Sequence, residues 1–249
     1  MNKKIVHIYN WWQADDKTMN RMIRAKRTWQ KFYKYDKYGF LIAEFSLENE
    51  QRSSLSLGEK VTAPFLKDVI DYGLLAYPDC NLFLYTNTDI SLVINASNYM
   101  RDCLEKWECG YSHRVDFSEK DIPKNTITRN QLKGKLPLGS WSAGSDVFFF
   151  TRRWWNNHKG NLPDALIGFE AWDACVMAAM FKSGLPEPIK WLSYHQTHHP
   201  YWKKHRLTSK GQLYNRRVCT EWAIKNNLGH LINYGIFLFK LPTPYNVII

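Results

Sequence analysis

The chain has 249 residues, 45% of them apolar, which suits one large α/β domain or two small ones with a real core. No apolar run reaches the roughly 18 residues that cross a bilayer, and the start lacks the pattern of a secretion signal. We therefore expect a cytoplasmic protein without a transmembrane segment. The five cysteines form no CxxC pair, which argues against a zinc ribbon or a disulfide framework and favours reduced thiols.

The formal net charge is +11, and it is concentrated in two segments. Residues 17–38 and residues 200–249 each hold eight basic side chains against one acid. Such concentrated charge is the electrostatic footprint of a polyanionic partner, with an ordinary solvated surface as the alternative.

Strand and helix patterns alternate along the chain. The expected strands are residues 5–9, 40–45, 81–86, 111–117, 146–150 and 189–194. The expected helices are residues 17–35, 62–76, 96–108, 169–183 and 211–227, the second opened by Thr62 as N-cap. Residues 118–140 are rich in Lys, Asn, Gly and Pro and are expected to form a long loop. The alternation predicts an α/β fold with a mostly parallel central sheet flanked by helices.

The strand expected at residues 81–86 ends abruptly in Asn87-Thr88-Asp89. Asn87 and Asp89 are two apart, so their side chains point the same way if the strand geometry continues. Many α/β proteins place oxygen ligands for a metal and a phosphate at the carboxyl end of a buried strand. A plain Asn/Asp turn after the strand is the alternative.

Three further clusters carry carboxylates or imidazoles at expected strand ends or helix starts. They contain Asp146 after Gly144-Ser145, the acids Glu170 and Asp173 around Trp172, and the histidines His195, His198 and His199.

Taken in this order, the four motifs resemble those of small GT-A-fold nucleotide-sugar glycosyltransferases, over roughly residues 62–200. Those enzymes hold a divalent metal against a sugar-nucleotide diphosphate with a DxD-type motif, and here Asn87 replaces the first Asp. The resemblance implies a single GT-A-like domain. Within it, residues 1–117 would form the nucleotide-sugar-binding half, residues 118–200 the acceptor and catalytic half, and residues 201–249 a basic, helical C-terminal extension.

For the metal, the resemblance implies that Asp89 and a late histidine, His195 or His198, are ligands. The expected ion is Mn²⁺ or Mg²⁺, and an imidazole ligand favours Mn²⁺. A loop of surface or hydrogen-bonded histidines is the alternative.

For catalysis, the resemblance implies an acid near residue 170 that activates the acceptor hydroxyl or holds the donor sugar, and Asp173 matches better than Glu170. Acids also gather at helix N-termini for electrostatic reasons alone. Asp146 either hydrogen-bonds sugar hydroxyls or caps a turn.

For the donor, which we expect to be a UDP-sugar, GT-A enzymes place the nucleotide base at the end of the first strand. Tyr9, Asn10 and Trp11 lie there, and an aromatic ring could stack on a pyrimidine, although core packing explains one of Trp11 and Trp12 equally well. Asp68, on the helix before the Asn87 strand, either reaches the uridine or sugar or is simply solvated.

The expected function is metal-dependent sugar transfer to a hydroxyl acceptor. DNA with hydroxylated bases, as in phage-type DNA modification, is the favoured acceptor, because no amphipathic membrane-docking segment stands out. DNA binding would need residues 17–38 and 200–220 to form one continuous basic surface. A cell-surface glycan or lipid-linked acceptor is the alternative.

Two other classes explain less of the sequence. A nucleic-acid-binding α/β module without chemistry explains the charge but not the acids and histidines at strand ends. A metal-dependent nuclease needs several carboxylates converging on two metals, and no motif of that kind is apparent.

Overall fold

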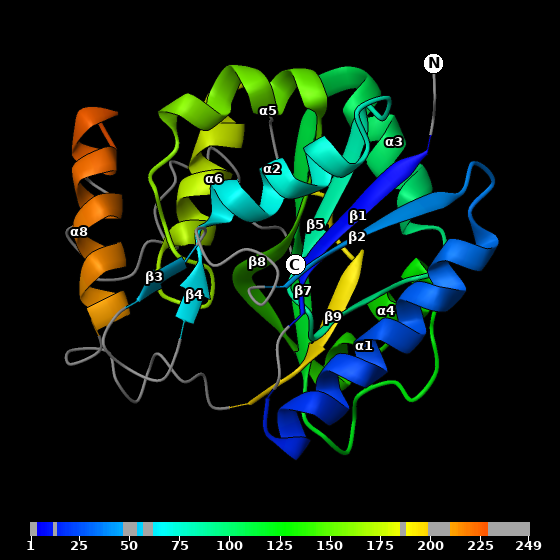
Figure 1. Cartoon of the computed structure of the whole chain (residues 1–249). Coiled ribbons are helices and arrows are strands. Elements are labelled where there is room, and N and C mark those ends of the chain that lie inside the picture. The colour runs from blue at the N-terminus through cyan, green and yellow to red at the C-terminus, as the bar shows by residue number, and fades with distance from the viewer. Residues whose placement is uncertain are drawn as a thin grey trace.

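The structure is a computed structural model, and it describes residues 4–11, 14–46, 54–56, 62–184, 188–198 and 210–228. A seven-stranded central sheet is flanked by helices, which confirms the expected α/β class (Figure 1). Its strands are β1 (Ile5–Asn10), β2 (Phe40–Phe45), β5 (Leu82–Thr86), β6 (Ile90–Leu92), β7 (Cys109–Phe117), β8 (Gly139–Thr151) and β9 (Ser193–Gln196). A separate two-stranded ribbon pairs β3 (Ser54–Ser56) with β4 (Thr62–Pro64).

The strand order in the sheet is β2-β1-β5-β8-β7-β9-β6. β1 runs parallel to β2 and β5, and β7 runs parallel to β9. β8 is antiparallel to β5 and β7, and β6 is antiparallel to β9. Five of the seven strands therefore point the same way, so the sheet is mostly parallel, as expected. Their carboxyl ends meet at one edge, where ligands bind in open α/β sheets.

The described helices are α1 (Asp16–Tyr35), α2 (Leu66–Ala76), α3 (Ala96–Trp107), α4 (Arg129–Gly134), α5 (Arg152–His158), α6 (Trp172–Lys182) and α8 (Lys210–Lys225). Single 3₁₀ turns follow α4 and α5, at Leu136–Leu138 and Lys159–Asn161. Outside the sheet, α8 packs against α6, so the described part of the expected C-terminal extension is helical.

Two successive residues of β1, whose side chains point to opposite faces of the sheet, show that helices cover both faces. The ring of His7 packs on Trp29 of α1. Ile8 packs on Gly73 of α2, so closely that a Cβ atom added to this glycine would lie 2.4 Å from the Ile8 side chain. Trp29 also donates a hydrogen bond from Nε1 to the carbonyl of Ile90 in β6, at 2.8 Å. Because β1 and β6 are far apart in the strand order, this helix can touch both only if the sheet curls around it.

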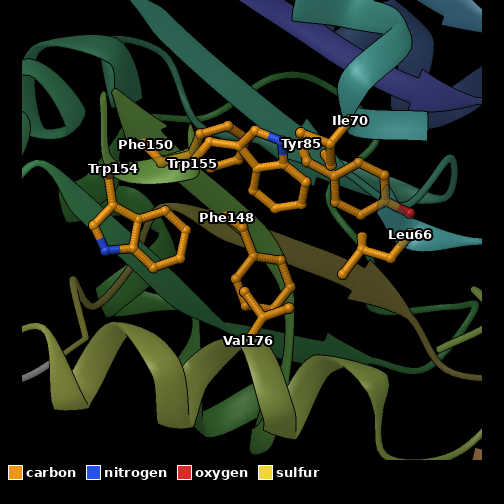
Figure 2. A pocket seen from close by; sticks show the side chains of 8 residues that line it. All are labelled: Leu66, Ile70, Tyr85, Phe148, Phe150, Trp154, Trp155 and Val176. Atoms are coloured by element: carbon orange, nitrogen blue, oxygen red, sulfur yellow. The ribbon is translucent and has the colours of Figure 1, made fainter. Parts of the chain in front are cut away.

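The core between the sheet and helices α2, α5 and α6 is largely aromatic. Figure 2 shows an apolar pocket there, lined by Leu66, Ile70, Tyr85, Phe148, Phe150, Trp154, Trp155 and Val176. The ring of Tyr85 lies in this core, while its hydroxyl donates to Oδ1 of Asn87 at 2.9 Å. Packing of the aromatic core therefore fixes the first residue of the Asn87-Thr88-Asp89 turn. All five cysteines are buried thiols that form no disulfide.

Several boundaries differ from the sequence-based expectations. Residues 62–64 form β4, so α2 begins at Leu66 and Thr62 is not its N-cap. The expected loop at 118–140 contains α4, whose N-cap Thr128 forms a capping box with Gln131. The strand expected at 146–150 begins at Gly139, because its polar first half pairs with β7. The last strand spans Ser193–Gln196 instead of residues 189–194.

A buried ion pair joins α1 to α3 at the edge of the core. Arg101 of α3 donates two hydrogen bonds, 2.6 and 2.9 Å long, to the carboxylate of Asp36, which caps the end of α1. Only 7% of the Arg101 side chain and none of the Asp36 side chain is exposed. Burial alone would raise the pKa of Asp36, but hydrogen bonds from Arg101 and Ser97 outweigh it and hold that pKa below its ordinary value.

We predict that Arg101→Met lowers the free energy of unfolding at pH 7 by about 3–5 kcal/mol, because it leaves a buried carboxylate without its partner. The pKa of Asp36 is lowered in the folded state, so the ion pair stabilises the protein fully at pH values above the ordinary pKa of 3.8. This stabilisation is lost as the pH falls below that value. Denaturant titrations should therefore show the difference shrinking as the pH falls through the folded-state pKa. Arg153→Met breaks an exposed pair with Glu108 and should cost less than about 1 kcal/mol. Equal losses for both variants would contradict the prediction.

Candidate functional site

Asp89, His195 and His198 lie together at the carboxyl edge of the sheet. Asp89 precedes β6, His195 lies in β9, and β9 pairs with β6 so that His195 faces Ile90. The Oδ2 atom of Asp89 is 3.3 Å from Nε2 of His195 and 3.2 Å from Nε2 of His198. The sequence left open which histidine accompanies Asp89, and the structure brings both to it.

This cluster fits a divalent cation. One potential ligand atom from each of the three residues lies within 4.8 Å of the others. Two ligands at right angles, each about 2.2 Å from a metal, are about 3.1 Å apart, close to the two separations around Asp89. One carboxylate oxygen with two imidazole nitrogens suits Mn²⁺, Fe²⁺, Co²⁺ or Zn²⁺ better than Mg²⁺.

The charges of the cluster support one another. Burial opposes ionisation of Asp89, but the charges of His195 and His198 and their hydrogen bonds hold its pKa well below the usual range. Burial alone would lower the pKa of His195, whereas the charge of Asp89 and a hydrogen bond to Asp116 raise it above the ordinary value. The carboxylate of Asp89 and the imidazole of His195 therefore favour each other's charged forms, and a bound cation would supply the positive charge in place of the imidazolium.

Two residues of β7, Arg114 and Asp116, belong to the site and were missed in the sequence. Asp116 faces His195 in the register of β7 and β9, and its Oδ1 lies 3.0 Å from Nδ1 of that histidine. Arg114 donates from Nε to the same oxygen at 2.8 Å, and its Nη1 pairs with Asp146. Two opposite charges, two residues apart in an expected strand, were the available signal, because they must share a face.

Asn87 joins the turn to β8 rather than to the cation cluster. Its Nδ2 donates to Oδ1 of Asp146 at 2.5 Å, while its Oδ1 accepts from Tyr85. The amide of Ile90 donates to the Asn87 carbonyl at 3.3 Å, so the segment is a turn as well as part of the site. Asp146 is held by Asn87 and Arg114, and its alternative role as a turn cap is not needed to explain its position.

Asp173 lies in the first turn of α6 and faces β7 and β8. Burial raises the pKa of its carboxyl above the ordinary value, although the backbone of Ala174 and Ser145 and the charge of Arg114 pull it down. Arg114 thus contacts Asp116 and Asp146, and its charge acts on Asp173.

Glu170 lies outside the helix that it was expected to open with Asp173. Helix α6 begins at Trp172, after Ala171 in the left-handed conformation, so the two acids do not share a helical face. The Glu170 carboxylate pairs with Nε of Arg216 at 3.4 Å, and its backbone amide donates to Gln212. Both partners belong to α8, which makes Glu170 an anchor for that helix.

The end of β1 holds the residues expected at the nucleotide base. Tyr9 is buried, with its hydroxyl donating to Glu44 at 2.7 Å, so its ring is part of the core and offers no stacking face. Oδ1 of Asn10 is buried and accepts no hydrogen bond from the described residues. Trp11 is half-buried, and Nζ of Lys26 lies 4.6 Å from its ring centre.

The remaining predicted residues are less informative. Asp68 is half-buried in the first turn of α2, which packs on β1 and β2. Trp12, His199, Lys203, Lys204 and Arg206 lie outside the described residues.

The basic residues lie on two separate surfaces. Arg27, Lys31 and Lys34 are exposed on α1, whereas Lys210, Arg217 and Lys225 are exposed on α8. Figure 1 places these helices at opposite sides of the molecule. The described part of residues 200–220 therefore does not continue the α1 surface. In the part of the chain that the structure describes, no helix has both the length and the apolar composition needed to cross a membrane.

Comparison with known proteins finds only distant similarity. No protein-family model and no curated protein matches the chain. One similar solved structure is a glycosyltransferase involved in glycosylation of the major capsid of PBCV-1, with 13% identity and a TM-score of 0.34. That match covers 63% of this chain and spans only 64% of the other. A second is a protein described as a glucose-1-phosphate thymidylyltransferase from Bacillus anthracis, in complex with sucrose. It has 10% identity, a TM-score of 0.37, and coverage of 84% of this chain and 94% of the other. Similarity this low assigns no activity to the chain.

Proposed function

We propose that this protein is a metal-dependent glycosyltransferase that moves a sugar from a nucleoside-diphosphate sugar to a hydroxyl acceptor. The observation that carries the proposal is the cluster of Asp89, His195 and His198 at the carboxyl edge of a mostly parallel sheet. Its support is the series of contacts from His195 through Asp116 to Arg114 and Asp146, together with Asp173, whose pKa the charge of Arg114 lowers.

At the donor end, Asn10 and Trp11 would bind the nucleotide, with uridine as the preferred base. The buried Oδ1 of Asn10 needs a hydrogen-bond donor, and the imide N–H of a pyrimidine such as uracil is one. The half-buried ring of Trp11 offers the stacking face that Tyr9 lacks. Asp68 is the further candidate on the neighbouring helix.

Asp89, His195 and His198 would hold the divalent cation, for which Mn²⁺ is our first choice. When bound, such a cation acts as a Lewis acid that neutralises the leaving diphosphate. Asp146, which Asn87 and Arg114 hold rigidly, would accept hydrogen bonds from the donor sugar.

Asp173 would accept the proton of the acceptor hydroxyl as its oxygen bonds to the anomeric carbon and the bond from that carbon to the diphosphate breaks. Burial raises the pKa of Asp173, and a carboxylate with a raised pKa is a stronger base than an ordinary one. Glu170 is the weaker candidate because it pairs with Arg216.

The acceptor that we favour is a glycan, with DNA carrying hydroxylated bases as the alternative. DNA would need one continuous basic surface, and the exposed basic residues of α8 do not extend the stripe of Arg27, Lys31 and Lys34 on α1. This stripe is the one described feature that a DNA acceptor would use.

We predict that Asp89→Ala lowers Mn²⁺-dependent turnover of a UDP-sugar by about 10²-fold or more, since a metal ligand and several kcal/mol of charge stabilisation are lost. Asp79→Ala changes an exposed acid in the turn before β5 and should keep full turnover. A panel of nucleotide sugars, assayed for donor hydrolysis with Mn²⁺ or Mg²⁺, provides the measurement. Wild-type protein that hydrolyses none of them would rule out the proposed activity.

We predict that Asp173→Asn slows transfer by about 10²-fold or more with donor affinity little changed. Because the pKa of Asp173 is raised, the wild-type rate should increase with pH along a limb that lies above pH 3.8, and the Asn variant should lack that limb. Glu170→Gln discriminates between the two acids and should keep the rate within a few-fold. The reverse ranking of the two variants would move the base to Glu170.

For the DNA alternative, we predict that replacing Arg27, Lys31 and Lys34 with Gln weakens duplex DNA binding and lowers the slope of log affinity against log salt by roughly 3. The matched control replaces Lys210, Arg217 and Lys225 of α8, which removes the same charge from the opposite side and should change neither quantity. Fluorescence anisotropy at several salt concentrations measures both. A wild-type protein without salt-sensitive DNA binding would exclude DNA and leave the glycan as the acceptor.

A further inference from the structure

Asp116 lies behind the proposed metal ligands rather than among them. The cluster whose ligand atoms all lie within 4.8 Å of one another contains Asp89, His195 and His198 but not Asp116. Asp116 instead approaches the far nitrogen of His195, with 3.0 Å between its Oδ1 and Nδ1. Nε2, on the other side of the ring, is the atom that faces Asp89.

The direction of this hydrogen bond follows from the chemistry of the two groups. Nε of Arg114, a guanidinium nitrogen that can only donate, already donates to Oδ1 of Asp116 at 2.8 Å, so this oxygen acts as a carboxylate acceptor with no proton to give. Nδ1 of His195 must therefore donate to Asp116. An imidazole that keeps its proton on Nδ1 presents the lone pair of Nε2 to a metal, so this contact selects the ligating form.

Asp116 is itself held in place from its own strand. Arg114 donates from Nε to the same Oδ1 at 2.8 Å, and only 16% of the Asp116 side chain is exposed. The parallel pairing of β7 and β9 sets Asp116 directly beside His195, so backbone hydrogen bonds fix the distance between them. The carboxylate therefore has little freedom to turn away from the imidazole.

We propose that Asp116, fixed by Arg114, is a positioning residue that orients His195 and sets the affinity of the site for its divalent cation. This inference rests on the proposed metal site and adds a residue that the family resemblance did not indicate. Partners of this kind contribute about 10–100-fold to metal affinity when they support a ligating histidine.

The experiment measures Mn²⁺ dissociation constants on the full chain from the EPR signal of free Mn²⁺, without donor or acceptor. Asp116→Asn keeps a neutral acceptor for Nδ1 and should weaken Mn²⁺ binding by about 10-fold. Asp116→Ala removes the acceptor and should weaken it by up to about 100-fold. Asp121→Asn, the matched control, changes a carboxylate held by Ser118 and should leave the affinity unchanged. Circular dichroism and thermal unfolding report whether each variant is folded, and Asp116→Asn decides the question if the Ala variant is not.

A double-mutant cycle separates positioning from direct ligation. In a His195→Ala background, Asp116→Asn should cause no further loss, because the residue acts through the imidazole. A loss that persists would make Asp116 a ligand and overturn the proposal, as would a folded Asp116→Asn protein with wild-type affinity. If the wild type binds no Mn²⁺, the metal site fails together with this inference. Normal wild-type binding with an unaffected Asp116 variant overturns this inference alone.

Discussion

Four carboxylates lie close together at one edge of the sheet, and their repulsion has to be offset in partly buried surroundings. They are Asp89, Asp116, Asp146 and Asp173. Arg114 lies among the last three, while His195 bridges Asp116 and Asp89. The site therefore depends on β7, because one face of that strand supplies both the guanidinium of Arg114 and the carboxylate of Asp116 beside His195. The groups that face the Asp89 carboxylate are the imidazoles of His195 and His198. These imidazoles could bind a divalent cation, which would then supply the positive charge beside Asp89.

Much of the fold could be predicted from the sequence, because buried strands and amphipathic helices carry local patterns. No local pattern shows which strand a polar segment will pair with, and the errors in the sequence-based prediction occur in such segments. Gly139–Ser145 has too few apolar residues to indicate a strand, yet it extends β8 along β7. Residues 189–192 look like strand, but Trp191 adopts a φ of +69°, and regular pairing starts at Ser193. Thr62 looks like an N-cap until β3 pairs with it. In each case tertiary contacts override local preference.

The candidate site divides in the same way. Asp89, His195, His198 and Asp173 were accessible because chemically reactive residues next to strand ends or in a first helical turn are conspicuous in a sequence. Arg114 and Asp116 lie inside a strand, where the default expectation is a solvent-facing polar row. Their role emerges only when β9 is known to lie beside β7. Glu170 became a candidate because it was expected to open a helix together with Asp173, whereas its observed partner, Arg216, is distant in the sequence and could not be foreseen.

Asn87 illustrates why a departure from a familiar motif need not weaken the site. Its amide uses both ends, with Oδ1 accepting from the Tyr85 hydroxyl and Nδ2 donating to Asp146. A carboxylate at this position has no proton to donate and would face the Asp146 carboxylate at hydrogen-bond distance, adding a fifth negative charge to an edge with one guanidinium and two imidazoles among its described residues. An amide is therefore the side chain that this position requires. The metal-binding role that we propose then falls on Asp89 and the two histidines. Through Tyr85 and Asn87, the aromatic core also helps to order Asp146, the residue that we propose as partner of the donor sugar.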